Sequence, residues 1–180
     1  MNAPLRITLF GTFDIQGPEP ATRLAAQPKL VSVLVYLLLA TPRGYQRRDR
    51  VAGLFWPEQP DPRARASLRN VLYGLREALG PDAVETRGDE EVRVPDGAVE
   101  CDALAFERAI ADGELARALE LYRGELLAGT FLGVPALEQW LEERRTAYRS
   151  AAADAAWTLA QRYETATDLT AATRWARKAA

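Results

Sequence analysis

Hydrophobic and polar residues alternate at the start of the chain. The alternation covers residues 5–10 and resumes at Phe13 and Ile15, after Gly11. A period of two residues is typical of a half-buried strand. The run Gly-Pro-Glu-Pro at 17–20 is typical of a turn. We therefore predict a small antiparallel sheet ahead of the first helix.

The hydrophobic repeat then lengthens to three and four residues, which predicts helices. Such a repeat runs from Leu30 to Leu38 behind Pro28, a residue type favoured at helix starts. The run Thr-Pro-Arg-Gly at 41–44 ends this first helix. A short second helix is predicted over 48–56.

A third helix is predicted over 62–79, with one hydrophobic face and one basic face. Asp61 suits the N-cap position and Pro62 the first helical position, and Gly80 follows the last apolar residue. On a helical wheel, the hydrophobic sector contains Ala64, Leu68, Val71, Leu72, Leu75 and Leu79. The opposite face contains Arg63, Ala66, Arg69, Asn70, Tyr73 and Glu77, with Arg65 and Arg76 on its flank.

The basic face has the residue types that DNA-reading helices use. Arginine can bind guanine O6 and N7 with two hydrogen bonds, and asparagine can bind adenine in the same way. Arginine and tyrosine also bind phosphates, which fixes position without reading sequence. A solvated helix with a basic face is the alternative interpretation. The short helix just before this one favours DNA reading, because the pair has the order of a helix-turn-helix.

Two short strand patterns follow the third helix. Residues 84–86 and 92–94 flank a turn at 87–90 that contains a glycine, which predicts a β-hairpin. Arg87 would lie at the tip of this hairpin, where it could enter a minor groove or be an ordinary surface charge. Arg48, at the start of the second helix, is a candidate phosphate contact, with a solvated turn as the alternative.

From Asp102 onward the pattern is helical and rich in alanine. We therefore predict an α+β winged helix-turn-helix over 1–97, followed by an all-α, TPR-like domain over 98–180. An ordinary antiparallel pair of alanine-rich helices is the alternative for the last part of the chain. The tetratricopeptide spacing is matched by Ala156, Leu159, Ala160 and Tyr163, and then by Ala172, Ala176 and Ala179.

Charge is distributed unevenly along the chain. Residues 1–80 contain 11 basic and 6 acidic side chains, whereas residues 81–180 contain 12 basic and 19 acidic ones. A basic half beside an acidic half indicates a polyanion-binding part and a protein-binding part, although surface charge also varies between halves without function. The single cysteine, Cys101, and the lack of a signal peptide or a membrane-length apolar run predict a cytoplasmic protein that does not bind membranes.

Several segments, taken in order, resemble the SARP family of transcriptional activators (Streptomyces antibiotic regulatory proteins). In the first half they are Leu-Arg-Ile-Thr-Leu-Phe-Gly at 5–11, Leu-Phe-Trp-Pro-Glu at 54–58 and Ala-Arg-Ala-Ser-Leu-Arg-Asn-Val-Leu-Tyr-Gly-Leu-Arg at 64–76. In the second half, residues 101–106, 118–127 and 140–145 resemble the bacterial transcriptional activator domain. The resemblance covers nearly the whole chain, and the order of the segments is more specific than any one of them.

The resemblance implies a bacterial, nucleoid-associated regulator whose first domain is similar to the winged helix of OmpR-type response regulators. It implies binding to double-stranded promoter DNA and recruitment of RNA polymerase. The loop of Trp56, Pro57 and Glu58 corresponds to the family's polymerase-contacting loop, although Trp56 can equally be a core anchor. The third helix would enter the major groove and make its contacts through Arg63, Arg65, Arg69, Asn70 and Tyr73.

The chain departs from the family pattern at both ends. No receiver domain precedes the winged helix, so we expect no control by aspartyl phosphorylation. The final repeat looks unfinished at residue 180, so we expect the second domain to be incomplete. Missing repeats expose apolar surface, and that surface would be available for a homodimer or another partner.

Catalysis is not expected from this composition. Histidine, the commonest general base and metal ligand, is absent, and one cysteine cannot build a zinc cluster. The phosphate-binding pattern Gly-x-x-x-x-Gly-Lys-Ser/Thr is also absent. We therefore predict a non-enzymatic regulator without cofactor or metal. The alternative is a protein-interaction adaptor whose winged helix does not bind DNA.

Overall fold

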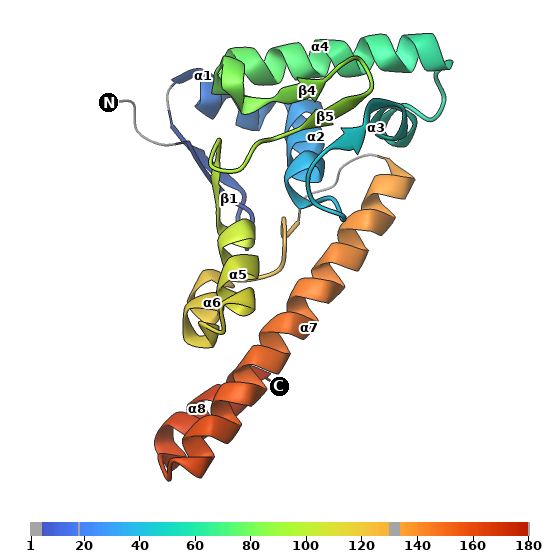
Figure 1. The fold of residues 1–180 in the computed structure, drawn as a ribbon. Helices are drawn as coiled ribbons and strands as arrows, with labels where there is room; N and C mark the ends of the chain where they lie inside the picture. Colours follow the sequence, from blue (N-terminus) through green and yellow to red (C-terminus); the bar gives the residue numbers. More distant parts are fainter. Residues whose placement is uncertain (1–4, 18, 130–133, 180) are drawn as a thin grey trace. The chain divides into compact units, whose positions relative to one another are not determined.

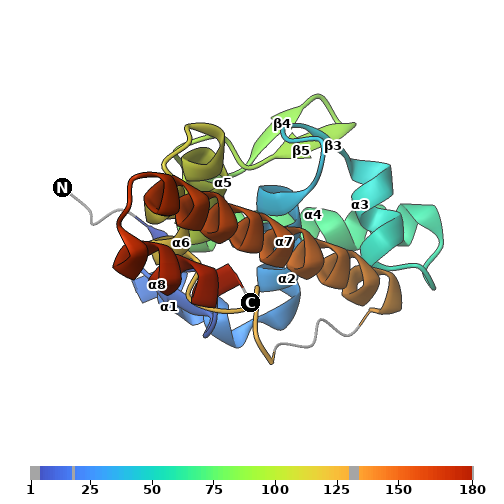
Figure 2. The same cartoon turned by 90° about the horizontal axis from the view of Figure 1, so that it is seen from below.

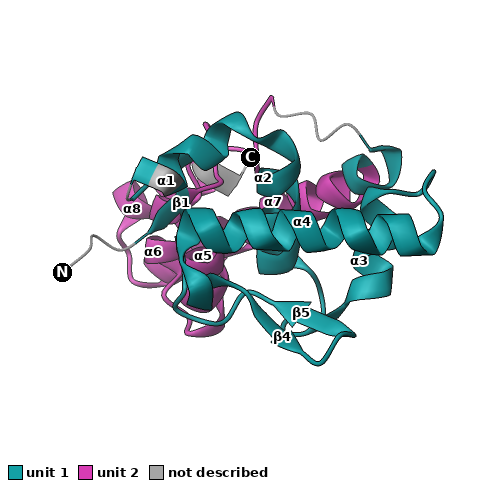
Figure 3. Cartoon of the chain, turned by 90° about the horizontal axis from the view of Figure 1, so that it is seen from above, with its two compact units in different colours: residues 1–7, 14–100, 131–138 teal, residues 8–13, 101–130, 139–180 magenta. Residues whose placement is uncertain are grey.

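A computed structural model describes residues 5–17, 19–129 and 134–179 of the chain. The chain divides into two compact units (Figure 3). Unit 1 comprises residues 1–7, 14–100 and 131–138, and unit 2 comprises residues 8–13, 101–130 and 139–180. The domain boundary between residues 97 and 98 stays a prediction from the sequence.

A small three-stranded sheet has the strand order β2-β1-β6. The Glu100 N–H donates to the Leu5 carbonyl at 2.9 Å, and the Arg6 guanidinium pairs with the Glu100 carboxylate at 3.0 Å. The alternating pattern of the sequence predicts β1 and β2, whereas the pairing of β1 with β6 has no local sequence signal. The strands are β1 (Arg6–Thr8), β2 (Asp14–Gln16) and β6 (Glu100–Cys101).

Helix α2 is the buried centre of unit 1 (Figure 1). It covers Pro28–Leu39, as its three- and four-residue repeat predicts, and every residue from Val31 to Leu39 is buried. Before it, where the sequence predicts only a turn, lie α1 (Glu19–Thr22) and the 3-10 helix η1 (Arg23–Ala26). Pro18 of that turn lies outside the described residues.

Helices α3 and α4 correspond to the predicted helix-turn-helix pair and pack against each other, and α4 also packs against α2. They cover Arg48–Phe55 and Asp61–Leu79. The prediction of Asp61 as the N-cap is wrong. The Pro60 carbonyl accepts hydrogen bonds from the N–H groups of Arg63 and Ala64, so the helix begins one residue earlier and no side chain caps it.

A second three-stranded sheet, with the order β3-β5-β4, forms the wing. The predicted hairpin is present, shifted by one residue, as β4 (Glu85–Arg87) and β5 (Glu91–Arg93), after the 3-10 helix η2 (Pro81–Ala83). The sequence gives no signal for β3 (Gln46–Arg47), which is too short to show a period and pairs Gln46 with Val92. Unit 1 is thus consistent with a winged helix-turn-helix.

Unit 2 has an aromatic core and an aspartate whose carboxylate accepts hydrogen bonds from backbone N–H groups. The rings of Phe106, Tyr122 and Tyr148 meet the ring of Phe10 at centroid distances of 5.0–5.5 Å. The Asp102 carboxylate accepts hydrogen bonds from the N–H groups of residues 9 and 10, at 2.8 Å and 3.0 Å. The helices are α5 (Asp102–Ala111), α6 (Leu115–Leu121), α7 (Pro135–Thr165) and α8 (Leu169–Ala179).

Helix α8 folds back alongside the carboxyl-terminal part of α7 (Figures 1 and 2). Of the residues that match the tetratricopeptide spacing, those on α7 are buried or half-buried, and Ala172 and Ala176 on α8 are half-buried. The side chain of Ala179 lies outside the described residues. A tetratricopeptide hairpin and an ordinary helix pair both have this burial, so the repeat stays a prediction. Within residues 5–17, 19–129 and 134–179, every helix is too short or too polar to span a bilayer.

Candidate nucleic-acid interface

Helix α4 has the two faces that its sequence predicts. The buried residues are Ala64, Leu68, Val71, Leu72 and Leu75, whereas Leu79, at the carboxyl end, is only half-buried. All six predicted residues of the opposite face are exposed: Arg63, Ala66, Arg69, Asn70, Tyr73 and Glu77. The helix therefore buries its leucines and exposes arginine, asparagine and tyrosine on the opposite face. It follows α3 in the chain after a tight turn.

Three residues of this face are free to meet a ligand. Among the described residues, the side chains of Arg63, Arg69 and Asn70 make no hydrogen bond or ion pair with a protein group. Tyr73 is 61% exposed, and a hydrogen bond to the Glu77 carboxylate is the main cause that raises the pKa of its hydroxyl.

The two flanking arginines of α4 differ in their surroundings. The Arg65 guanidinium pairs with the Asp49 carboxylate of α3 at 2.5 Å and remains half exposed. The Arg76 guanidinium donates from Nε and Nη2 to the Val84 carbonyl, at 3.1 Å and 3.0 Å. Arg76 therefore binds the backbone that leads into the wing, and only part of its donor capacity remains for a ligand.

Arg48 lies half-buried at the start of α3, among other charges of unit 1. Its backbone N–H donates to the Glu90 carbonyl at 2.7 Å, which ties the hairpin turn to the helix-turn-helix. Burial is the main cause that lowers the pKa of its guanidinium. The Asp89 carboxylate opposes this shift, and the guanidinium groups of Arg69, Arg76 and Arg65 add to it. Arginines of α4 thus add positive charge to the surroundings of Arg48, and a phosphate bound there would relieve this repulsion.

Arg87 does not lie in the hairpin turn, where the sequence places it. It is the last residue of β4, because β4 lies one residue later and β5 begins one residue earlier than predicted, which leaves only 88–90 for the turn. Its guanidinium stacks on the Tyr45 ring at 4.0 Å and pairs with Glu91 at 3.2 Å. Arg93 stacks on the same ring at 4.6 Å and pairs with Glu85 at 2.7 Å. The wing thus holds its arginines against an aromatic ring and two carboxylates.

The loop between α3 and α4 is anchored by its first aromatic residue. Trp56 is half-buried, and the Lys29 ammonium lies 5.1 Å from the centroid of its ring. The same ammonium donates to the Phe55 carbonyl at 3.0 Å, and burial lowers its pKa. Pro57 and Glu58 are exposed. The loop therefore has a fixed base at Trp56 and an accessible tip at the next two residues.

Three residues of this region have no role assigned from the sequence. Tyr45 carries the stacked arginines, Asp49 pairs with Arg65, and Asp89 lies near Arg48. Asp49 has a sequence signal only as an acidic residue in the first turn of a helix. The partners of all three come from other elements, so spacing along the chain could not predict them.

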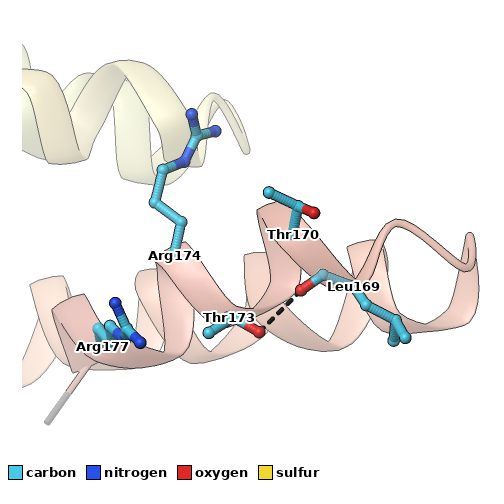
Figure 4. Close-up of a pocket in the computed structure, with 5 residues that line it drawn as sticks. All are labelled: Leu169, Thr170, Thr173, Arg174 and Arg177. Atoms are coloured by element: carbon cyan, nitrogen blue, oxygen red, sulfur yellow. Dashed lines mark hydrogen bonds between the residues drawn. The ribbon is translucent and has the colours of Figure 1, made fainter.

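A separate depression lies on α8 (Figure 4). Within it, the Thr173 hydroxyl donates to the Leu169 carbonyl at 2.8 Å. Its lining comes from one helix and brings no side chains of different elements together, so we do not assign a site to it. The lining residues are Leu169, Thr170, Thr173, Arg174 and Arg177.

Comparisons with known proteins identify a shared fold and no family. No family model matches the chain, and no curated protein matches it in sequence. In structure the chain is similar to EmbR of Mycobacterium tuberculosis, solved in complex with a low-affinity phosphopeptide, with a TM-score of 0.52 and 20% identity. The match covers 99% of this chain and 56% of the EmbR chain. The chain therefore has a fold like that of EmbR and spans about half of that protein's length.

Proposed function

We propose that this protein is a sequence-specific DNA-binding transcriptional regulator that activates promoters by recruiting RNA polymerase. The observation that carries the proposal is the exposed face of α4, where Arg63, Arg69 and Asn70 are free of protein partners. These residue types match the donor and acceptor pattern of guanine and adenine in the major groove. The EmbR-like fold and the resemblance to SARP activators support the same function.

The arginines of unit 1 divide into different roles under this proposal. Arg48 contacts a phosphate, because the guanidinium groups of Arg69, Arg76 and Arg65 add positive charge to its surroundings and a polyanion would neutralise it. Arg63, Arg69, Asn70 and Tyr73 lie on the free face of α4 and contact base edges or the groove walls. Arg87 joins them only if the wing releases it from Tyr45 and Glu91.

A pool of random duplexes tests DNA binding directly. The full chain is incubated with the pool at low salt, and retained duplexes are separated in a mobility-shift gel and sequenced. The proposal predicts retention and a recovered consensus. Arg63→Ala/Arg69→Ala is the test variant, and Arg117→Ala/Arg174→Ala, which removes the same charge from unit 2, is its control. No retention of any duplex by the wild-type chain would refute DNA binding.

The polymerase contact is assigned to Pro57 and Glu58. Both are exposed beside the half-buried Trp56, so they can meet a partner without unfolding the loop. Transcription in vitro from a promoter that carries the selected duplex sequence tests this assignment. Glu58→Ala should lower activation and leave DNA affinity unchanged. Equal activation by the variant and the wild type would remove this loop from the polymerase contact.

A protein-interaction adaptor is the second candidate. The observation that favours it is the acidity of the wing, where Asp89, Glu90 and Glu91 follow one another and would repel phosphates. Asp49 also places a carboxylate beside Arg65. The same random-duplex experiment separates the two candidates, because an adaptor would retain no duplex at low salt.

A further inference from the structure

The ion pair of Arg65 and Asp49 joins the two helices of the helix-turn-helix on the candidate DNA-binding surface. Arg65 Nη2 lies 2.5 Å from Asp49 Oδ1, and the two side chains are 54% and 47% exposed. Asp49 Oδ2 also lies 3.7 Å from Arg47 Nη2. The pair is therefore accessible to a ligand, and its carboxylate comes from α3 whereas its guanidinium comes from α4.

The geometry leaves Arg65 with donors to spare. A guanidinium has five N–H donors in a fixed fork, and the contact with Asp49 is made through a single terminal nitrogen. A partner that holds one guanidinium nitrogen fixes the direction of the other N–H donors. Less conformational freedom is therefore lost when those donors bind a ligand. Arg65 lies near the amino end of α4, and it is this end of a recognition helix that contacts base edges.

The carboxylate also determines which acceptor suits Arg65. A phosphate beside Asp49 would bring two negative groups together, which costs free energy, whereas guanine O6 and N7 are neutral acceptors. Arg48 is different, because the guanidinium groups of Arg69, Arg76 and Arg65 outnumber the single Asp89 carboxylate among the charges that act on it, so a phosphate is favoured there. Arg76 differs again, because the Val84 carbonyl occupies its Nε and Nη2.

We infer that Asp49 is a specificity-determining residue that positions the Arg65 guanidinium for a base edge and keeps it from phosphate. The inference rests on the proposed function, since it requires that unit 1 binds DNA. An ordinary surface ion pair would affect the stability of the protein only slightly and would not affect its preference for a DNA sequence, so the two cases can be distinguished.

The test compares a preferred duplex with a scrambled one. The preferred duplex comes from the random-pool selection, and dissociation constants of the full chain are measured by fluorescence anisotropy. The variants are Asp49→Asn, Arg65→Ala and the double variant. Asp82→Asn is the control, because it removes the same charge from an exposed position of unit 1.

Asp49→Asn should weaken binding to the preferred duplex about fivefold to tenfold, as for a disturbed arginine–guanine contact. It should tighten binding to the scrambled duplex, because a negative charge is lost from the surface. In the Arg65→Ala background, the same change should cause no further loss on the preferred duplex. Asp82→Asn should leave the ratio of the two dissociation constants unchanged.

Three results would overturn the inference. If Asp49→Asn tightens binding to both duplexes by the same factor, Asp49 acts only through its charge. If it weakens preferred binding equally with and without Arg65, it does not act through that residue. In both cases DNA binding stands and only the inference fails. If the wild-type chain binds no duplex, the proposed function and the inference fail together.

Discussion

The Arg76 guanidinium donates two hydrogen bonds to the Val84 carbonyl, at 3.1 Å and 3.0 Å, and thereby joins α4 to the base of the wing. Val84 is buried, so loss of the guanidinium would leave a buried carbonyl without this donor. A charged side chain of α4 thus has a structural role in unit 1.

Arg76→Ala should therefore lower the free energy of unfolding by about 1–3 kcal/mol, the cost of leaving a buried acceptor without its donor. Arg63→Ala, which removes an exposed arginine of the same helix, should change it by less than about 0.5 kcal/mol. Urea unfolding followed by circular dichroism measures both values. Equal effects of the two substitutions would show that the Val84 contact does not stabilise the fold.

Tyr45 should stabilise the wing through its ring rather than through its hydroxyl. The guanidinium groups of Arg87 and Arg93 lie 4.0 Å and 4.6 Å from the ring centroid. The hydroxyl makes a hydrogen bond to the Glu85 carboxylate at 3.2 Å, which is long for a bond between two oxygen atoms. Exposed cation–π contacts contribute about 0.5–1 kcal/mol each. Tyr45→Leu should thus destabilise the protein more than Tyr45→Phe in urea unfolding. A larger loss from Tyr45→Phe would contradict this account of the wing.

The stability of unit 2 should fall at alkaline pH through Tyr148. Burial raises the pKa of this hydroxyl, and the Glu107 carboxylate, which accepts its hydrogen bond at 2.5 Å, raises it further. The neutral form is therefore favoured in the folded state. The stabilisation is fully present below the ordinary tyrosine pKa of about 10 and is lost as pH rises above it toward the folded value.

Tyr148→Phe should reduce the decrease in the free energy of unfolding at alkaline pH, because phenylalanine has no proton to release. The free energy of unfolding is measured in urea at several pH values from neutral to about one unit above the ordinary tyrosine pKa. Tyr122, whose pKa burial also raises, keeps part of the slope in the variant. A variant whose alkaline slope equals that of the wild type would show that Tyr148 does not titrate as its environment requires.

Helices α2, α3 and α4 could be predicted from the sequence because their signals are local. The leucines of α4 recur at helical spacing, and the prolines at residues 28 and 62 lie in the first turns of α2 and α4. Strand β3 and the pairing of β6 could not be predicted, because two residues have no period and their partners lie far along the chain. Asp61 illustrates the limit of boundary prediction, since Pro60 begins the hydrogen bonds of α4.

The candidate site could be predicted in residue type but not in geometry. A helical wheel separates Arg63, Arg69 and Asn70 from the buried face, and the structure places them as expected. The same wheel cannot show that Arg76 turns to the Val84 carbonyl or that Arg65 meets Asp49. Those contacts depend on how α3, α4 and the wing pack, which is a property of the tertiary structure.

The most direct measurement for the central claim is the affinity of Arg69→Ala for the duplex selected by the wild-type chain. Arg69 is exposed on α4 and pairs with no described protein group, so its guanidinium is available to a base. The account predicts that binding of the selected duplex weakens by about 1–3 kcal/mol, with little change on a scrambled duplex of equal length. Arg117→Ala, on an exposed position of unit 2, should bind as the wild type does. An Arg69→Ala variant that binds the selected duplex as tightly as the wild type would contradict the reading of DNA by α4.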